Sequence, residues 1–302
     1  MSLMRSSRTL WRYRWLYLMI IPGALFFIIF RYAPMGGLVI AFQNYQPFLG
    51  IAGSDWVGLR HFERLFMEDT FFLLLSNTLI LFGLGVLTFP LPIILALLLN
   101  EVRRKWFRNI VQSVLYIPHF MSWVIVVSLF SVFLTVDRGL INELIRFFGG
   151  DPIHFLTDPN WARTIYIIQD IWKNIGWNTI IYSAAIASVD VSLFEATSID
   201  GAGRFRQIWH VTLPAIRPTI VILFILRTGS ILEIGFEHVF LLINALNRSV
   251  LEIFDTFVFT AGLMNGQLSF STAVGLFRGI AGLIMVVGAN MLAKKFGEEG
   301  IY

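Results

Sequence analysis

Apolar residues fill six long stretches of the chain, and short segments rich in charged or polar residues separate these stretches. Within each stretch the apolar positions run nearly all round a helix, which is typical of helices surrounded by lipid. A membrane-spanning helix needs roughly 20 such residues. We therefore expect an all-α membrane protein with about six transmembrane helices. The expected spans lie near residues 15–30, 71–99, 111–136, 162–189, 216–243 and 271–293.

The composition of the chain supports a membrane protein. Of its 302 residues, 57% are hydrophobic, only 14% are charged, and 29 are phenylalanine. That is more apolar surface than one soluble core buries. A soluble protein with buried helices is the alternative, but its helices would need polar faces at a spacing of about 3.6 residues. Because the sequence shows no internal repeat, we treat residues 1–302 as a single transmembrane domain.

Lysine and arginine residues alternate from one side of the expected spans to the other. They precede the first span, follow the second, flank the connection between the fourth and fifth, and follow the sixth. Loops rich in these residues face the cytoplasm, so both termini are expected to be cytoplasmic. The net charge of +4 fits a basic fringe against anionic membrane lipid and predicts no nucleic-acid partner. The basic residues are Arg5, Arg8, Arg12, Arg14, Arg103, Arg104, Lys105, Arg108, Arg204, Arg206, Arg217, Lys294 and Lys295.

Several kinds of site chemistry are missing from the sequence. The chain has no cysteine, and its five histidines show none of the spacings of a metal site. A phosphate-binding P-loop requires glycine directly before lysine. No lysine of this chain follows a glycine. The sequence therefore predicts no metal site and no Walker-type ATP site in this chain.

The segment 195–214, EATSIDGAGRFRQIWHVTLP, follows the fourth expected span, so it is expected to face the cytoplasm. Its pattern predicts a short helix over residues 193–199, a break at DGAG, and a second short helix over residues 204–212. The second helix is expected to end before Pro214, because the residue that precedes a proline avoids the helical conformation. Residues 193–214 are called the cytoplasmic loop below.

The break and the second helix of the cytoplasmic loop have features that predict their roles. Asp200 is suited to capping the helix that follows, and Gly201 is suited to a bent backbone. A short helix with an apolar face needs a partner, which is either lipid headgroups or a groove in another protein. Periodicity alone favours neither partner. The residues expected to share the apolar face are Phe205, Ile208, Trp209 and Thr212.

The cytoplasmic loop resembles the signature of binding-protein-dependent ABC importer permeases, which is E-A-A, two residues, D-G-A, a spacer and L-P. The sequence departs from that pattern at Thr197, Ile208 and Val211. Other segments, including YIPHFMSWV, DIWKNIGWNTIIY and FGEEGIY, look like permeases for oligosaccharides and polysaccharide fragments, uronate-rich ones such as alginate among them. The residues that match the signature are Glu195, Ala196, Asp200, Gly201, Ala202, Leu213 and Pro214.

This resemblance implies a type I ABC importer permease fold in the bacterial inner membrane. The partners would be a second permease, usually a different chain, two cytoplasmic ATPase subunits, an external solute-binding protein and an oligosaccharide. The chain itself would be no enzyme and would bind no cofactor, because ATP and Mg²⁺ would bind to the ATPase subunits. The cytoplasmic loop would dock into an ATPase cleft, with Glu195 in a charge-assisted contact. An ordinary solvated carboxylate near a helix start is the alternative for Glu195.

Ionisable residues inside the expected spans are costly there and indicate function. Asp170 and Lys173 are three residues apart and are expected to form a structural ion pair on one helix face. Arg227 lies near mid-membrane, roughly 15 Å along the helix from the start of the fifth apolar stretch. An ion pair between Arg278 and one of two glutamates is one interpretation. The charged candidates for the substrate pathway are Arg227, Glu233, Glu237 and Arg278.

Aromatic and amide side chains supply further candidates, because sugar rings stack on aromatic faces and sugar hydroxyls bind amides. Trp172, Asn178 and Tyr182 of the fourth expected span are the candidates for the substrate pathway. Tryptophan and tyrosine also form the interfacial belt of membrane proteins, so a belt or packing role is the alternative.

Two other classes of function fit the sequence less well than the importer permease. A proton-coupled secondary sugar transporter would use Glu233 and Glu237 as its proton relay, but it leaves the cytoplasmic loop unexplained. An intramembrane enzyme would need a convergent set of catalytic residues, and the sequence shows no motif with such spacing.

Overall fold

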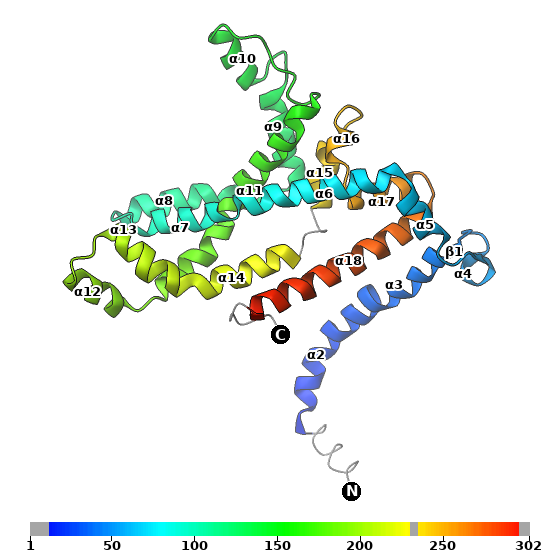
Figure 1. The fold of residues 1–302 in the computed structure, drawn as a ribbon, viewed down its shortest axis with the longest axis horizontal. Helices are drawn as coiled ribbons and strands as arrows, with labels where there is room; N and C mark the ends of the chain where they lie inside the picture. The colour runs from blue at the N-terminus through cyan, green and yellow to red at the C-terminus, as the bar shows by residue number, and fades with distance from the viewer. Residues whose placement is uncertain (1–11, 230–234, 296–302) are drawn as a thin grey trace.

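The computed structural model describes residues 12–229 and 235–295, and it is almost entirely helical (Figure 1). The first half contains α2 (Arg14–Phe27), η1 (Ile28–Tyr32), α3 (Ala33–Met35), η2 (Gly36–Phe42), β1 (Gln43–Asn44), α4 (Gly50–Gly53), β2 (Asp55–Trp56), α5 (Arg60–Met67), α6 (Asp69–Thr88), α7 (Pro90–Asn100), α8 (Lys105–Tyr116), η3 (Ile117–Phe120), α9 (Trp123–Leu134) and α10 (Leu140–Phe147). The second half contains α11 (Pro159–Ala187), α12 (Val191–Ile199), α13 (Arg204–Gln207), η4 (Ile208–Thr212), α14 (Leu213–Gly229), α15 (Phe236–Leu242), α16 (Arg248–Leu251), α17 (Phe254–Phe259), η5 (Thr260–Met264) and α18 (Leu268–Lys295). The short strands β1 and β2 pair antiparallel.

Helices long and apolar enough to span a membrane confirm the expected class. Four are continuous, and they cover Arg14–Phe42, Asp69–Asn100, Arg204–Thr228 and Leu268–Gly288. Two further candidates are bent pairs, Lys105–Phe120 with Trp123–Leu134 and Pro159–Ala187 with Val191–Ile199. If each pair is one span, the described residues contain six.

Two of the expected spans were wrong in their extent. The third, residues 111–136, is not one helix, because the chain bends by 105° between η3 and α9. The fifth, residues 216–243, is not one helix either, because Gly235 has a non-helical backbone and α15 begins as a separate short helix at Phe236.

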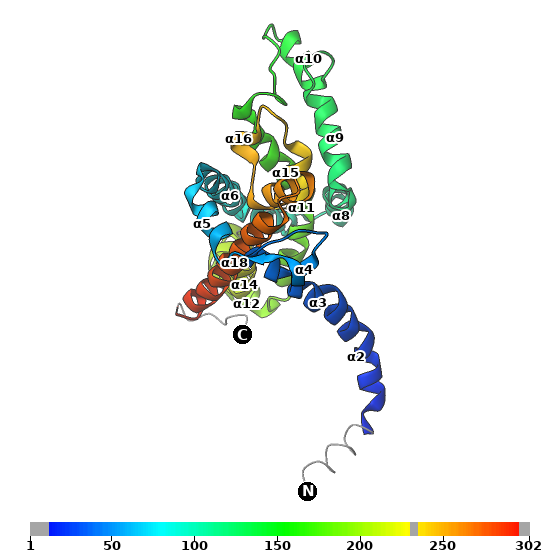
Figure 2. The same ribbon diagram turned by 90° about the vertical axis from the view of Figure 1, so that its right-hand side faces the viewer.

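Helix α11 lies at the centre of the bundle, and buried apolar side chains join it to helices on several sides. One cluster packs α11 against α6, α15 and α16 around Tyr166 and Leu251. A second packs it against α7 and α14 around Tyr182 and Ile216. The third cluster joins α5, α6, α17 and α18 around Phe254. Helix α2 differs, since none of its residues is buried, and it stands away from the bundle in both views (Figures 1 and 2).

The bend between η3 and α9 is held by a lysine from another span. The Nζ atom of Lys173, which is buried in α11, donates hydrogen bonds to the carbonyl oxygens of His119 at 2.7 Å and of Met121. It also lies 5.4 Å from the centre of the Trp123 ring. A helix end leaves its last carbonyls without partners, and lipid offers no donor for them. The ammonium group supplies that donor.

The expected ion pair between Asp170 and Lys173 was therefore wrong. The lysine binds the carbonyl oxygens of the bend, whereas the carboxylate of Asp170 accepts a hydrogen bond from Asn174 Nδ2 at 2.9 Å. Carbonyl groups at membrane depth compete for the lysine because they have few other donors.

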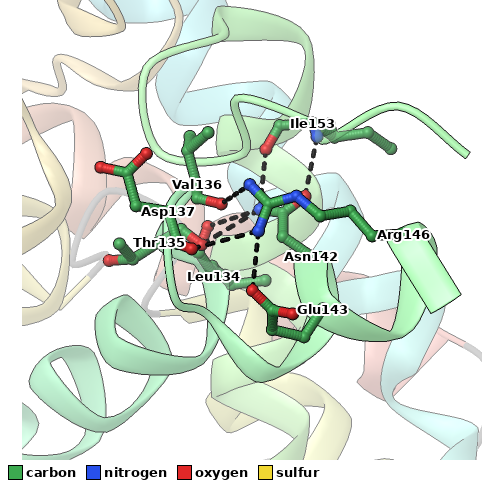
Figure 3. A network of polar contacts seen from close by, with 8 residues as sticks. All are labelled: Leu134, Thr135, Val136, Asp137, Asn142, Glu143, Arg146 and Ile153. Atoms are coloured by element: carbon green, nitrogen blue, oxygen red, sulfur yellow. Dashed lines mark hydrogen bonds and ion pairs between the residues drawn. The ribbon is translucent and has the colours of Figure 1, made fainter.

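Helices α9 and α10 form an arm that extends from the bundle, and Figure 3 shows the polar contacts that fix it. The buried Asn142 side chain donates to the carbonyl oxygens of Thr135 and Ile153, both at 3.1 Å, and accepts from the Ile153 N–H at 2.7 Å. Arg146 donates to the carbonyl oxygen of Val136 at 2.8 Å and pairs with Glu143. These contacts hold α10 against the end of α9.

Candidate functional site

The cytoplasmic loop begins at a well-defined helix start. The carboxylate of Asp190 accepts a hydrogen bond from the backbone N–H of Ser192 at 2.9 Å and so caps α12. Hydrogen bonds from the backbone and the side chain of Ser192 lower the pKa of Asp190, because they stabilise its charged form. The helix runs from Val191 to Ile199, two residues longer than expected at its start.

The DGAG break ends α12 in a Schellman motif. The N–H of Ala202 donates to the carbonyl of Thr197 at 2.9 Å, and the N–H of Gly201 donates to the carbonyl of Ser198 at 3.1 Å. Gly201 has a φ of 73°, a left-handed conformation that glycine adopts without strain. Asp200 is the C-cap of α12. The expectation that Asp200 caps the second helix was wrong, because that N-cap position is Gly203.

The second helix of the cytoplasmic loop does not end before Pro214. Helix α13 passes through the π-helical turn η4 into α14, so residues 204–228 form one continuous helix. A proline lacks the N–H that would continue the hydrogen-bond ladder, and its ring crowds the carbonyl four residues earlier. The wider π turn directly before Leu213 accommodates that ring.

The cytoplasmic loop presents large apolar side chains at its surface. Ile199 is 87% exposed, Phe205 78% and Trp209 60%, and the last two rings stack with their centres 6.5 Å apart. Of the four residues expected to share the apolar face, Phe205 and Trp209 are exposed, Ile208 is half-buried and Thr212 is buried. Glu195 is exposed on α12, one helical turn before Ile199.

Two polar contacts fix the cytoplasmic loop to itself and to the bundle. Gln207 Nε2 donates to Ser198 Oγ at 2.8 Å, which joins α12 to α13. Arg204 forms an ion pair of 3.0 Å with Glu101, which lies at the end of α7. The loop is therefore held as a unit beside the connection between α7 and α8.

A polar cavity of about 270 Å³ lies between α6, α7, α11 and α14. Helix α11 contributes Asp170, Asn174 and Asn178, which are spaced four residues apart and so share one helix face. Helix α14 contributes Arg227 from the opposite wall. The remaining lining residues are Gly85, Thr88, Phe89, Pro92, Ile181, Tyr182 and Leu223. This space is called the membrane cavity below.

The guanidinium of Arg227 lies directly against the backbone of α6. A Cβ atom added at Gly85 would collide with the Nη2 atom of Arg227, so no other residue fits at position 85 with the arginine in this place. The Arg227 charge also interacts electrostatically with the carboxylate of Asp170. The cavity thus contains one cation and one anion beside two amides, a set that suits a polar ligand carrying a carboxylate and hydroxyls.

The structure brings some of the predicted pathway residues together and leaves others apart. Arg227, Asn178 and Tyr182 line the membrane cavity. Trp172 packs edge-on against Phe130, with ring centres 5.7 Å apart. Glu237 is exposed in the first turn of α15, and Arg278 forms an ion pair with Asp255. Glu233 lies outside the described residues.

Two lining residues, Asp170 and Asn174, were not predicted for the pathway although their signal was available. Together with the predicted Asn178 they recur at four-residue spacing in a largely apolar helix, which is the pattern of a polar stripe. Gly85 carried no comparable signal, because its importance depends on an arginine 142 positions later in the chain.

Comparison with known proteins assigns the chain to a family. Residues 88–297 match the family model described as "Binding-protein-dependent transport system inner membrane component", and the chain belongs to this family. It is a permease subunit of an ABC importer, and its helices have the type I importer permease fold. A permease provides the passage through the membrane and is not itself an enzyme. The resemblance noted in the cytoplasmic loop is thereby confirmed.

Individual relatives show which transporters within this family the chain is similar to. The chain is 65% identical, over 96% of its length and 90% of the relative, to the polygalacturonan/rhamnogalacturonan transport system permease protein YteP of Bacillus subtilis (strain 168). It is 40% identical to a chain in the crystal structure of a bacterial ABC transporter involved in the import of the acidic polysaccharide alginate, with a TM-score of 0.90 over 96% of this chain and 99% of that one. A second structure, of a bacterial alginate ABC transporter in complex with alginate pentasaccharide-bound periplasmic protein, gives 39% identity and a TM-score of 0.90 over 97% and 99% of the two chains.

Proposed function

We propose that the chain is the transmembrane subunit through which an ATP-driven importer moves an acidic oligosaccharide from a solute-binding protein into the cytoplasm. The observation that carries this proposal is the membrane cavity, in which Arg227 stands among amide groups. Galacturonan and alginate are built from uronic acids, so the substrates named for the similar proteins share a carboxylate on the sugar ring. A guanidinium is the side chain best matched to a carboxylate.

The cavity residues take distinct roles in this proposal. Arg227 binds a uronate carboxylate, and the amides of Asn174 and Asn178 bind ring hydroxyls. Asp170 balances the charge of Arg227 while no substrate is present, because a lone cation at membrane depth is costly. The substrate carboxylate replaces Asp170 as the partner of the arginine. Tyr182 offers an aromatic ring at the wall of the cavity.

The assembly proposed around this chain follows from its cytoplasmic loop. An ATPase subunit receives the exposed apolar residues of the loop, and Glu195 makes a charge-assisted contact with a basic residue of that subunit. ATP and Mg²⁺ bind to two such ATPase subunits. A second permease completes the passage, and both termini of this chain lie in the cytoplasm. Residues 1–302 form one transmembrane domain, with residues 193–214 as its coupling helices.

Uptake by the complete importer in proteoliposomes tests the proposal. We expect ATP inside the vesicles and the solute-binding protein outside to drive uptake of a labelled trigalacturonide. Arg227→Gln should lower that uptake by about tenfold or more, since a hydrogen bond to a charged group contributes about 1.5–3 kcal/mol. Arg227→Lys keeps the charge and should retain more uptake. Ile222→Gln, on an exposed part of the same helix, is the control for a polar residue in α14.

Further measurements test separately the docking role of Glu195, the dependence of uptake on ATP and the role of Arg227. Glu195→Ala should lower substrate-stimulated ATP hydrolysis without changing how much complex assembles. Uptake that follows a proton gradient and needs no ATP would contradict the importer. ATP-driven uptake in which Arg227→Gln and wild type transport the trigalacturonide equally would contradict the role of the cavity arginine alone.

A further inference from the structure

A second cavity, of about 210 Å³, lies between the end of α7, the start of α8 and the last turns of α11. Four polar side chains line it, and they come from all three helices. The rest of its wall is apolar. The four polar residues are Asn100, Arg108, Gln112 and Ser183. This space is called the α8 cavity below.

The polar groups of the α8 cavity lack protein partners. The Ser183 hydroxyl oxygen is buried without a hydrogen-bond partner. Within residues 12–229 and 235–295, the side chains of Asn100, Arg108 and Gln112 likewise form no hydrogen bond or ion pair. A buried polar group without a partner costs about 1–3 kcal/mol. Of the four, the Ser183 hydroxyl bears this cost, because Asn100 is exposed and Arg108 and Gln112 are half-buried. A ligand in the cavity supplies the partner of that hydroxyl and meets three further polar side chains that no described protein group occupies.

The α8 cavity is separate from the membrane cavity. At about 100° per residue, Ser183 and Ala187 lie about 180° and 220° round α11 from Asn174, whereas Asn178 lies only about 40° from it. The two cavities therefore occupy opposite faces of α11. A saccharide in the membrane cavity does not reach the α8 cavity. The ligand of the α8 cavity comes instead from the side on which α8 packs.

That side of the molecule is apolar along α8 and basic at its start. Trp106, Phe107, Ile110 and Val114 are all exposed along α8, as expected for a helix against lipid tails. Arg103, Arg104 and Lys105 precede them and are exposed as well. Basic residues next to a span attract anionic headgroups of the cytoplasmic leaflet. Arg108 lies about 4.5 Å further along the helix than Lys105, one turn beyond this basic cluster.

We propose that the α8 cavity binds the headgroup of an anionic phospholipid from the cytoplasmic leaflet. Arg108 pairs with the phosphate, and Asn100, Gln112 and Ser183 bind its other oxygens or the headgroup hydroxyls. The acyl chains lie along the exposed apolar face of α8. The bound lipid joins α7, α8 and α11 beside Glu101, whose ion pair with Arg204 reaches the cytoplasmic loop. Anionic lipid therefore supports the coupling between that loop and the spans.

Lipid retention by the assembled importer tests this site. The complex is placed in nanodiscs of phosphatidylcholine with a minor fraction of phosphatidylglycerol, and tightly bound lipid is counted by native mass spectrometry. Wild type should retain phosphatidylglycerol. Arg108→Gln should weaken that retention by about tenfold, the effect of losing one charge-assisted hydrogen bond. Arg103→Gln is the matched control, because it removes an exposed arginine of the same connection that does not line the cavity.

The outcomes distinguish a specific lipid site in the α8 cavity from nonspecific attraction of anionic lipid by surface charge. Retention lost in Arg108→Gln and kept in Arg103→Gln supports the site, and so does a smaller loss in Ser183→Ala. Equal losses in both arginine variants would overturn it in favour of diffuse surface charge. Unchanged retention in Arg108→Gln would overturn it outright. In nanodiscs of phosphatidylcholine alone, substrate-stimulated ATP hydrolysis should be lower because the site holds no anionic lipid. Added inorganic phosphate should not restore this hydrolysis. Restoration that depends on Arg108 would assign the cavity to free phosphate instead of lipid.

Discussion

Two of the breaks between helices in the described residues differ in how their unpaired backbone groups find hydrogen-bond partners. The break after α12 lies in the cytoplasmic loop and is closed by its own backbone, through the N–H groups of Gly201 and Ala202. The break after η3 lies within a bent span, and its carbonyl groups are bound by Lys173 from another helix. A break in water can rely on sequence neighbours and solvent. A break at membrane depth needs a donor brought by the fold.

The largest effect is expected from removing the distant donor. Lys173→Met should destabilise the chain by about 3 kcal/mol or more, because carbonyl groups of the bend lose an ammonium partner where water cannot replace it. The yield of assembled importer and its thermal unfolding temperature should both fall. Lys173→Arg keeps a cation and several donors, so it is the matched control and should lose much less. Normal assembly and unfolding of Lys173→Met would show that the bend satisfies its own carbonyls.

A smaller effect is expected at the break in water. Gly201→Val places a branched side chain at a φ of 73°, which costs about 1–2 kcal/mol. The end of α12 should loosen, so that amide hydrogen exchange over residues 191–199 becomes faster and substrate-stimulated ATP hydrolysis falls. Gly203→Ala is the control, since this glycine has a φ of −69° and open space around its Cβ position. Similar exchange in both variants would mean that the left-handed turn does not fix α12.

The smallest effect is expected at the start of α12, and it depends on pH. Hydrogen bonds from Ser192 lower the pKa of Asp190 below its ordinary value near 3.8. The cap therefore contributes its full stability above that value and loses it as the pH falls through the lowered pKa. Amide exchange of the first turn of α12 should accelerate over this acidic range in wild type. Asp190→Asn keeps an acceptor without a charge and should remove that pH dependence, whereas Asp190→Ala should exchange faster at every pH.

The same contrast explains what the sequence could predict. The break at DGAG was located correctly because glycine and its neighbours determine a Schellman motif within six residues. The bend between η3 and α9 was missed, since residues 111–136 are largely apolar and the lysine that stabilises the bend lies 52 positions beyond Met121. The family, the fold class and most of the spans were predicted correctly, because they depend on local sequence.

The membrane cavity shows that contacts between residues distant in sequence also limit the prediction of a functional site. Asp170 and Lys173 are close in sequence and opposite in charge, so a local pair was the natural expectation. In the fold, Lys173 donates hydrogen bonds to the carbonyl groups of the bend. Asp170 instead lines the membrane cavity, which Arg227 of α14 also lines. Arg227 was predictable as a charge at membrane depth. The position of its guanidinium against Gly85 could not be predicted, because a glycine of one helix and an arginine of another come into contact only when the helices pack.

The uninterrupted helix from residue 204 to residue 228 connects the cytoplasmic loop directly to the membrane cavity, so a tilt at one end displaces the other. Phe205, near the start of this helix, and Arg227, in the membrane cavity, are 22 residues apart, or up to about 33 Å along a helix. Each degree of tilt about the Phe205 end therefore moves the Arg227 backbone by up to about 0.6 Å. A tilt of about 5° displaces it by about 3 Å, which is roughly the length of one hydrogen bond. If the cavity binds substrate as proposed, a small displacement of the loop is geometrically sufficient to break a hydrogen bond between Arg227 and that substrate.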